Sequence, residues 1–215
     1  MRAASLRQAL WHRHVNAVNA PAAMREWLTE GGSLTARLSA HSGAFRVQRL
    51  HQHRAMCLPD EARRIGLARP GQAWEREVLL RCDGRPVVFA HTVVPLSASA
   101  SDWPLFSALG ERSLGSTLFK DPQVRRGALE FARIRAGHPL MRRAFVALGG
   151  DPHDAGLQDA ILHDAMAHHA THQTIYYARR CLYRRHQGAL LVTEVFLPPV
   201  LGLVAATTNK NEMTL

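Results

Sequence analysis

Two stretches of the chain, far apart in sequence, share one pattern of apolar and polar positions. The first runs from Arg76 to Pro95 and the second from Arg179 to Pro198, and each has apolar, strand-forming residues on both sides of a short turn. Asp83-Gly84 marks the first turn and Gln187-Gly188 the second. Such runs around a glycine turn are typical of β-hairpins. We therefore predict two antiparallel hairpins, each ending at a proline.

The rest of the chain is predicted to form short helices and two more strands. Strand patterns cover residues 45–53 and 128–135. Helical patterns cover residues 21–28, 33–43 (with Ser33 as the cap), 60–65, 101–109 and 113–119, and also 138–178 with an interruption at 149–152. Hairpins combined with short helices, without a β-α-β rhythm, favour an α+β domain built on an antiparallel sheet. We predict a single domain over residues 1–215.

Three segments are expected to lie outside the regular core. Residues 1–20 contain arginines and no acid, which indicates a loosely ordered basic tail; they have no continuous apolar stretch of the kind found in a secretory signal. Residues 137–175 are predicted to be a helical, histidine-rich insertion, and residues 201–215 a polar C-terminal tail.

Composition and charge narrow the possible environment and partners. A chain of 215 residues with 47% hydrophobic residues can bury a sizeable core, and no apolar run is long enough to span a membrane. Cys57, Cys82 and Cys181 are an odd number without metal-type spacing, which fits a reducing cytoplasm. The net charge of +10 favours anionic partners. Because the arginines are dispersed, a dedicated nucleic-acid groove is not indicated, and capture of a small acid fits the charge at least as well; composition alone does not choose between them.

Two charged residues within the apolar strands are the main candidates for chemistry. Alternation places Arg76 on the same strand face as Val78 and Leu80, while Glu194 lies in a strand that is apolar on both faces. A buried charge is costly unless it is paired or binds a ligand. One interpretation is structural: an Arg76–Glu194 ion pair, or a carboxylate that backbone donors satisfy. The other is a pocket in which Arg76 holds a carboxylate and Glu194 accepts a hydrogen bond from a substrate hydroxyl.

Six strings in one order carry a family resemblance. They are W-x-R-E-V-L-L, D-G-x-P-V-V, T-V-V-P, S-L-G-S-T-L-F, L-E-F-A-R-I and L-L-V-T-E-V-F-L-P. Together, over residues 25–135 and 176–198, the chain resembles the chorismate pyruvate-lyases, which make 4-hydroxybenzoate for the ubiquinone pathway. The resemblance implies a monomeric α+β domain whose ligand is buried beneath helical flaps. It also implies chorismate as substrate, 4-hydroxybenzoate as product, and a reaction without metal or organic cofactor.

The resemblance also assigns site residues. The family's carboxylate-binding arginine falls on Arg76 and its buried glutamate on Glu194, so these two are the expected catalytic residues. The leucine of its ligand-contacting L-G turn falls on Leu114. A ligand-contacting methionine of the family falls on Leu34, which keeps an apolar wall while departing from the pattern.

Other chemistry is less favoured by the sequence. A histidine cluster contains His163, His168, His169 and His172. Within it, His168 and His172 are four residues apart and could share one helical face. A solvated helix surface is nevertheless favoured over a metal site. The serines at 97, 99 and 101 lack a nucleophile elbow. His91 precedes Pro95 by the same number of residues as Glu194 precedes Pro198. One interpretation points His91 into the same pocket, and a hydrogen-bonded strand histidine is favoured over it.

Two alternative functions stay open beside the lyase. The same fold serves as an effector-sensing domain in some transcription regulators, but no helix-turn-helix segment precedes it here, and Arg76 together with Glu194 favours an enzyme. Nucleic-acid binding is supported by charge alone.

Overall fold

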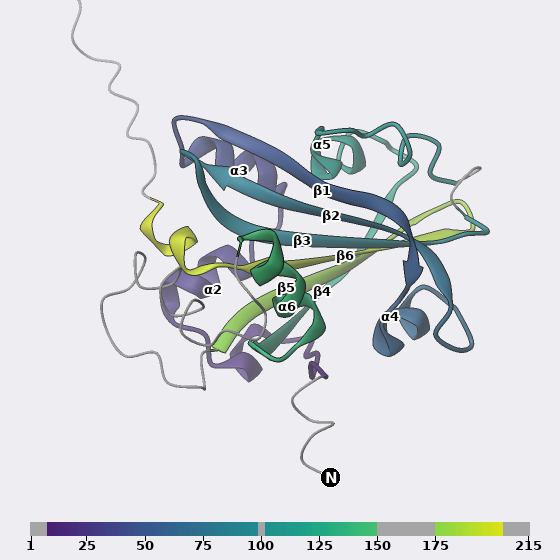
Figure 1. Ribbon diagram of the computed structural model, residues 1–215, viewed down its shortest axis with the longest axis horizontal. Helices are drawn as coiled ribbons and strands as arrows, with labels where there is room; N and C mark the ends of the chain where they lie inside the picture. Colours follow the sequence, from purple (N-terminus) through teal and green to yellow (C-terminus); the bar gives the residue numbers. More distant parts are fainter. Residues whose placement is uncertain (1–7, 99–101, 150–174, 204–215) are drawn as a thin grey trace, which may run out of the picture.

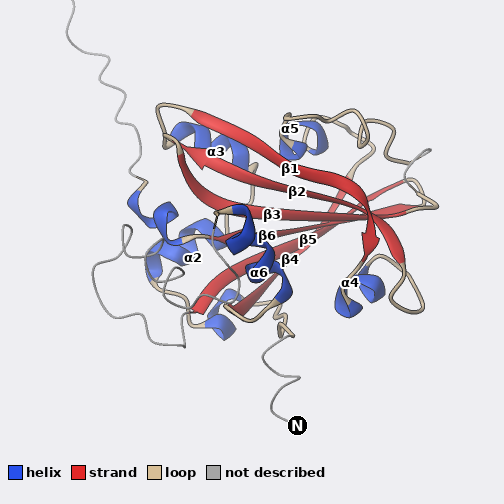
Figure 2. Cartoon of the chain, viewed as in Figure 1, coloured by secondary structure: helices blue, strands red, loops and turns tan. Residues whose placement is uncertain are grey.

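The structure is a computed structural model that describes residues 8–98, 102–149 and 175–203. Within these ranges the chain forms one six-stranded antiparallel sheet with short helices around it (Figures 1 and 2). The strands are β1 (Phe45–Met56), β2 (Gln72–Cys82), β3 (Arg85–Pro95), β4 (Arg125–Arg135), β5 (Ile175–Arg185) and β6 (Gly188–Phe196). The helices are η1 (Val15–Val18), α2 (Ala22–Leu28), α3 (Leu34–Ala40), α4 (Pro59–Arg64), α5 (Leu114–Leu118), α6 (Pro139–Ala147) and η2 (Pro198–Gly202). The predicted α+β class is confirmed.

The sheet order β1-β2-β3-β6-β5-β4 places the two predicted hairpins side by side. Strands β2 and β3 form the first hairpin, β5 and β6 form the second, and β3 pairs with β6. Functional groups on the two hairpins can therefore face one common pocket across β3.

The first hairpin turns at Asp83 and Gly84, as predicted, and both have positive φ angles. The prediction for the second hairpin was wrong by one residue, because the turn lies at His186 and Gln187. Gly188 is already in β6, where a Cβ would come within 2.7 Å of the Asp102 carboxyl carbon. The glycine serves this close approach within a strand, not the turn itself.

Helices and loops cover both faces of the sheet. Helices α2 and α3 pack with the face that carries Val78 and Leu80, and the segment around α5 packs on the same face. Helices α4 and α6 pack on the opposite face, against residues that include Leu79. In Figure 1, β1 passes in front of α3 while α6 lies in front of the sheet, which shows the two layers.

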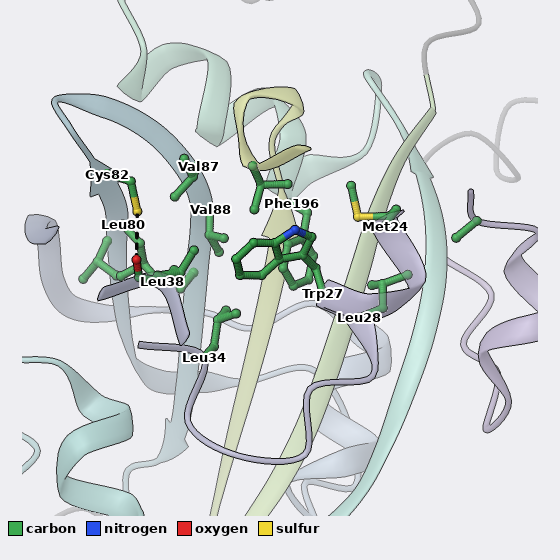
Figure 3. Close-up of a cluster of buried hydrophobic side chains, with 14 of the residues drawn as sticks. Met24, Trp27, Leu28, Leu34, Leu38, Leu80, Cys82, Val87, Val88 and Phe196 are labelled. Carbon is green, nitrogen blue, oxygen red and sulfur yellow. Dashed lines mark hydrogen bonds between the residues drawn. The ribbon is translucent and has the colours of Figure 1, made fainter. Parts of the chain in front are cut away.

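The core beneath α2 and α3 fixes their position on the sheet. Figure 3 shows Trp27, Leu34 and Leu38 packed against apolar side chains of β2, β3 and β6, including Phe196. Ser33 caps α3 as predicted, because its hydroxyl accepts a hydrogen bond from the Ala36 amide. The first residues of α3 are thereby held at the edge of this core.

Two helical predictions were wrong. Residues 102–109 form turns and not a helix; Trp103, Phe106 and Leu109 pack into the core, whereas Leu105 is exposed. The pattern predicted as helical over 138–178 contains α6, but residues 175–178 belong to β5, where they pair with β4 and β6. Sheet pairing outweighs local helical preference at that position. Residues 150–174, with the histidine cluster, lie outside the described residues.

The predicted N-terminal tail is partly wrong as well. His12 exchanges two backbone hydrogen bonds with Phe131 of β4, and the Trp11 indole donates to Asp60 at 2.9 Å. Residues 8–20 are therefore anchored to the domain, and residues 1–7 lie outside the described ranges. At the other end, the predicted tail overlaps the last two residues of η2. None of the described helices has the length and apolarity needed to cross a membrane.

Candidate active site

Arg76 is a buried cation without a carboxylate partner among the described residues. Its side chain is 2% exposed, and one guanidinium nitrogen donates to the carbonyls of Gly110 and Arg112 at 3.1 and 3.0 Å. Its Nε is buried and has no hydrogen-bond partner in the described part of the chain. Burial, and secondarily the charge of Arg49, lower the pKa of Arg76 to about 10. The group is still protonated at neutral pH and can bind an anion.

Glu194 is paired with Arg179 and not with Arg76. The two residues face each other across the β5–β6 hairpin, and Arg179 Nε donates to Glu194 Oε2 at 2.6 Å. A structural Arg76–Glu194 pair, the alternative left open by the sequence, does not form. The Glu194 side chain keeps 19% exposure toward the pocket that it lines, which leaves its other oxygen accessible to a ligand hydroxyl.

Arg179 also connects Glu194 to the end of helix α2. Its Nη1 donates to the carbonyls of Trp27, Leu28 and Glu30 at 3.2, 3.3 and 3.0 Å. These are carbonyls at and just beyond the C-terminal end of the helix, which a cation stabilises. Sequence reasoning missed Arg179, because the turn misplaced by one residue puts Cys181 opposite Glu194. The correct hairpin register was the signal that could have found it.

One pocket joins the predicted site residues. Arg76, Glu194, Leu34 and Leu114 all line it, and so does Tyr183, which the sequence analysis did not single out. Burial raises the pKa of Tyr183, so its phenol stays protonated. The sequence therefore named four residues that the fold brings together, while their roles toward a ligand stay predictions.

The beginnings of α3 and α5 form two covers over this pocket. Thr35 of α3 and Ser113, just before α5, share a hydrogen bond of 2.6 Å between their hydroxyls. Gly115 lies under the same contact, where a Cβ would meet the Thr35 hydroxyl at 3.3 Å. The covers are therefore closely packed and joined by a polar contact that could break to admit a ligand.

Strand β3 sets the distance between the two charged groups. Arg76 pairs with Thr92, and Glu194 pairs with Ala90, two residues away on the same face of β3. Because neighbouring strands lie about 4.8 Å apart, the two residues are separated laterally by roughly 10 Å at the backbone. The small side chains of Ala90 and Thr92 line the floor between them. The two charged groups therefore lie on either side of β3 within one pocket.

His91 points to the other face of the sheet. It is fully buried, with Glu77 Oε1 3.0 Å from its Nδ1 and Glu61 Oε1 3.1 Å from its Nε2. The predicted hydrogen-bonded strand histidine is confirmed, and His91 takes no part in the pocket around Arg76. Of the three loop serines, positions 99 and 101 lie outside the described residues.

Comparison with known proteins identifies the family to which this chain belongs. The sequence model of the family described as Chorismate lyase matches residues 5–153, more than half of the chain. The chain belongs to the chorismate lyase family. This confirms the resemblance found in the sequence, and it places the chain among lyases.

Individual relatives of the family are similar over most of their length. A probable chorismate pyruvate-lyase of Cupriavidus metallidurans is 44% identical over 202 residues, covering 92% of this chain and 84% of the relative. One of Ralstonia nicotianae is 49% identical over 172 residues, covering 80% of each chain.

Solved structures with similar folds are remote in sequence. The transcriptional regulator PhnF of Mycobacterium smegmatis has a TM-score of 0.47 at 12% identity, covering 78% of this chain and 64% of that chain. The ligand-binding domain of a GntR-family regulator from Bordetella bronchiseptica has a TM-score of 0.44 at 13% identity, covering 73% and 86%.

Proposed function

We propose that this protein removes pyruvate from chorismate to give 4-hydroxybenzoate, as a monomeric cytoplasmic enzyme that supplies ubiquinone synthesis. The observation that carries the proposal is Arg76, a buried cation with no acidic partner among the described residues, in one pocket with the carboxylate of Glu194. A buried unpaired cation is costly, and an anionic ligand offsets that cost. Family membership supports chorismate as the source of that anion.

The ring carboxylate, the ring hydroxyl and the ring itself each have a counterpart in the pocket. The ring carboxylate binds Arg76 through a charge-assisted hydrogen bond, for which the unpartnered Nε is an available donor. The ring hydroxyl donates to Glu194, whose orientation is fixed by Arg179. Leu34 and Leu114 pack against the ring from the two covers. The substrate is held at both ends with its ether between them.

The reaction needs little beyond this positioning. The ring carbon–oxygen bond of the enolpyruvyl ether breaks, and its electrons stay with the oxygen that becomes the keto group of pyruvate. The ring carbon that bears the hydroxyl loses its hydrogen. The methylene carbon of the leaving enolpyruvate gains one hydrogen and becomes the methyl group of pyruvate. Because the ring becomes aromatic, orientation and electrostatics supply most of the catalysis. No residue of the pocket is required as a nucleophile.

The direct test is turnover of chorismate by the purified full chain, without added metal or cofactor. We expect 4-hydroxybenzoate and pyruvate in equal amounts, identified by chromatography and mass. Formation of 3-hydroxybenzoate would assign a different chorismate reaction. Tight binding of 4-hydroxybenzoate without any turnover would assign an effector-binding domain instead.

Substitutions then separate the two roles. Arg76→Ala is expected to lower kcat/KM at least 100-fold, because the carboxylate loses its anchor. Arg49→Ala is the matched control, since Arg49 is an exposed neighbouring arginine that the pocket does not include. Near-normal turnover of Arg76→Ala would refute the assignment.

A second pair of variants addresses the proton. Glu194→Ala is expected to remove most activity, whereas Glu194→Gln keeps an acceptor for the hydroxyl and loses the base. Substantial activity of Glu194→Gln would mean that Glu194 positions the substrate and that the hydrogen moves within the substrate. Loss of activity equal to that of Glu194→Ala would mean that Glu194 takes the proton.

A further inference from the structure

The sheet face opposite Arg76 carries two cross-strand pairs of histidine and glutamate. His51 of β1 pairs with Glu77 of β2, and His53 pairs with Glu75. The two imidazole rings lie 4.3 Å apart and are tilted by 31°. The His51 Nε2 is 2.8 Å from Glu77 Oε2 and 3.8 Å from Glu75 Oε1. Four groups of the type that binds transition metals therefore meet at one place.

This cluster opens into a groove beside helix α6. His51, His53, Glu75 and Glu77 line the groove together with residues that include Arg143. The carboxylates are nearly buried, whereas the His51 side chain is 31% exposed and His53 is exposed. An ion can therefore reach the histidines from solvent and find carboxylate oxygens behind them. Arg76, between the two glutamates in sequence, points to the other face and into the catalytic pocket.

The buried charges around the cluster do not balance. Glu61, Glu75 and Glu77 are three carboxylates, and two cations face them. Arg143 donates to Glu75 Oε2 and Glu77 Oε1 at 2.8 and 2.9 Å. The other basic side chain is His91, which lies between Glu61 and Glu77 at 3.1 and 3.0 Å. The three carboxylates therefore outnumber the two basic side chains that face them, even when His91 is counted as a cation.

We propose that His51, His53 and Glu75 bind a divalent transition-metal ion of the zinc type, with Glu77 beside them. One ligand atom from each of the three residues lies within 4.8 Å of the others. Ligand atoms about 2.1 Å from a tetrahedral zinc ion lie roughly 3.4 Å apart, so small side-chain movements complete the site. Two imidazoles and a carboxylate suit zinc, cobalt and nickel better than magnesium or calcium.

Arg143 and Arg142 affect this site in opposite ways. Arg143 holds the second oxygen of Glu75, which is how outer hydrogen bonds orient a metal-binding carboxylate. Arg142 also lines the groove, and its charge disfavours a cation, but it is exposed and screened by solvent. A bound ion would join β1 to β2 on the side opposite the substrate pocket. The inferred role is to stabilise the sheet, independently of the lyase reaction.

The test uses full-length, tag-free protein that has been stripped with a chelator. Titration calorimetry with Zn²⁺ is expected to show one site that His53→Ala weakens at least 10-fold. His14→Ala, at an exposed histidine whose side chain makes no capping bond, is the matched control and is expected to bind as the parent does. Zn²⁺ at 100 times its Kd is expected to raise the Tm by about 8 °C in the parent and not in His53→Ala.

Two further measurements exclude other ligands of the chain. Co²⁺ in the site is expected to give visible bands without the thiolate charge-transfer absorption that cysteine ligands would produce. The double variant His168→Ala/His172→Ala is expected to keep the site. The proposal is overturned if Zn²⁺ does not bind stoichiometrically, if His53→Ala binds as the parent does, or if binding is lost in the His168/His172 variant. Lyase turnover is expected to be equal with Zn²⁺ and with chelator, so failure of one proposal leaves the other intact.

Discussion

Arg179→Met offers the sharpest test of how the second hairpin prepares Glu194. The substitution keeps an apolar stem of similar length and removes the cation that binds Glu194 and three carbonyls at and just beyond the end of α2. Breaking a buried ion pair costs about 3–5 kcal/mol when one charge is left alone. Because Glu194 keeps some contact with solvent in the pocket, we expect a loss near 3 kcal/mol. For a domain of this size, that lowers the Tm by about 10 °C.

Activity is expected to fall by more than stability explains. Without Arg179, the Glu194 carboxylate can rotate, and misplacement of a catalytic group by about 1 Å can cost 100-fold in rate. We expect a 100-fold loss of kcat/KM, measured at a temperature where urea titration shows the variant to be folded. Adding Glu194→Gln to Arg179→Met is expected to recover part of the stability, because the unpaired buried charge is gone. The double variant is expected to recover none of the activity.

Arg180→Met is the matched control. Arg180 is the next residue of β5, is 6% exposed, and forms ion pairs of 2.7 Å with Asp60 and Glu130 on the opposite face of the sheet. It should cost a similar amount of stability and leave kcat/KM of the folded enzyme nearly unchanged. Normal turnover in Arg179→Met, or an equal loss of turnover in Arg180→Met, would refute the role given to Arg179.

Two more predictions concern the buried network and the pocket covers. Burial opposes the charge of Glu77, yet hydrogen bonds from His91 and Arg143 lower its pKa from 4.5 to about 2, so this stability is present above pH 4.5 and is lost as the pH falls toward 2. His91 has a raised pKa, so its contribution to stability is complete below pH 6.5 and is lost as the pH rises through 10. The urea midpoint of unfolding should therefore be highest between pH 4.5 and 6.5. If the midpoint falls with rising pH in His91→Gln as it does in the parent, this account is contradicted. Thr35→Val removes the hydroxyl contact between the covers, so stopped-flow release of 4-hydroxybenzoate should be several-fold faster, whereas an unchanged rate would mean that the covers do not gate the pocket.

The sequence by itself determined the local elements and the types of chemistry. Alternation and turn residues predicted both hairpins, and a serine cap with apolar spacing predicted α3. The cost of burying a charge singled out Arg76 and Glu194 before any distance was known. These inferences succeed because strand alternation, capping and desolvation act within a few residues of each other.

Only the tertiary structure decided which charges meet. Arg179 faces Glu194 because the turn falls at His186 and Gln187, whereas a turn one residue later would have placed Cys181 opposite Glu194. The same holds for the histidines of β1. The register slips between Arg49 and His51, so Val47 lines the substrate pocket while His51 joins Glu77 on the opposite face. Alternation alone puts both residues on one face; pairing with β2 decides the bulge, and such long-range pairing has no local signal in the sequence.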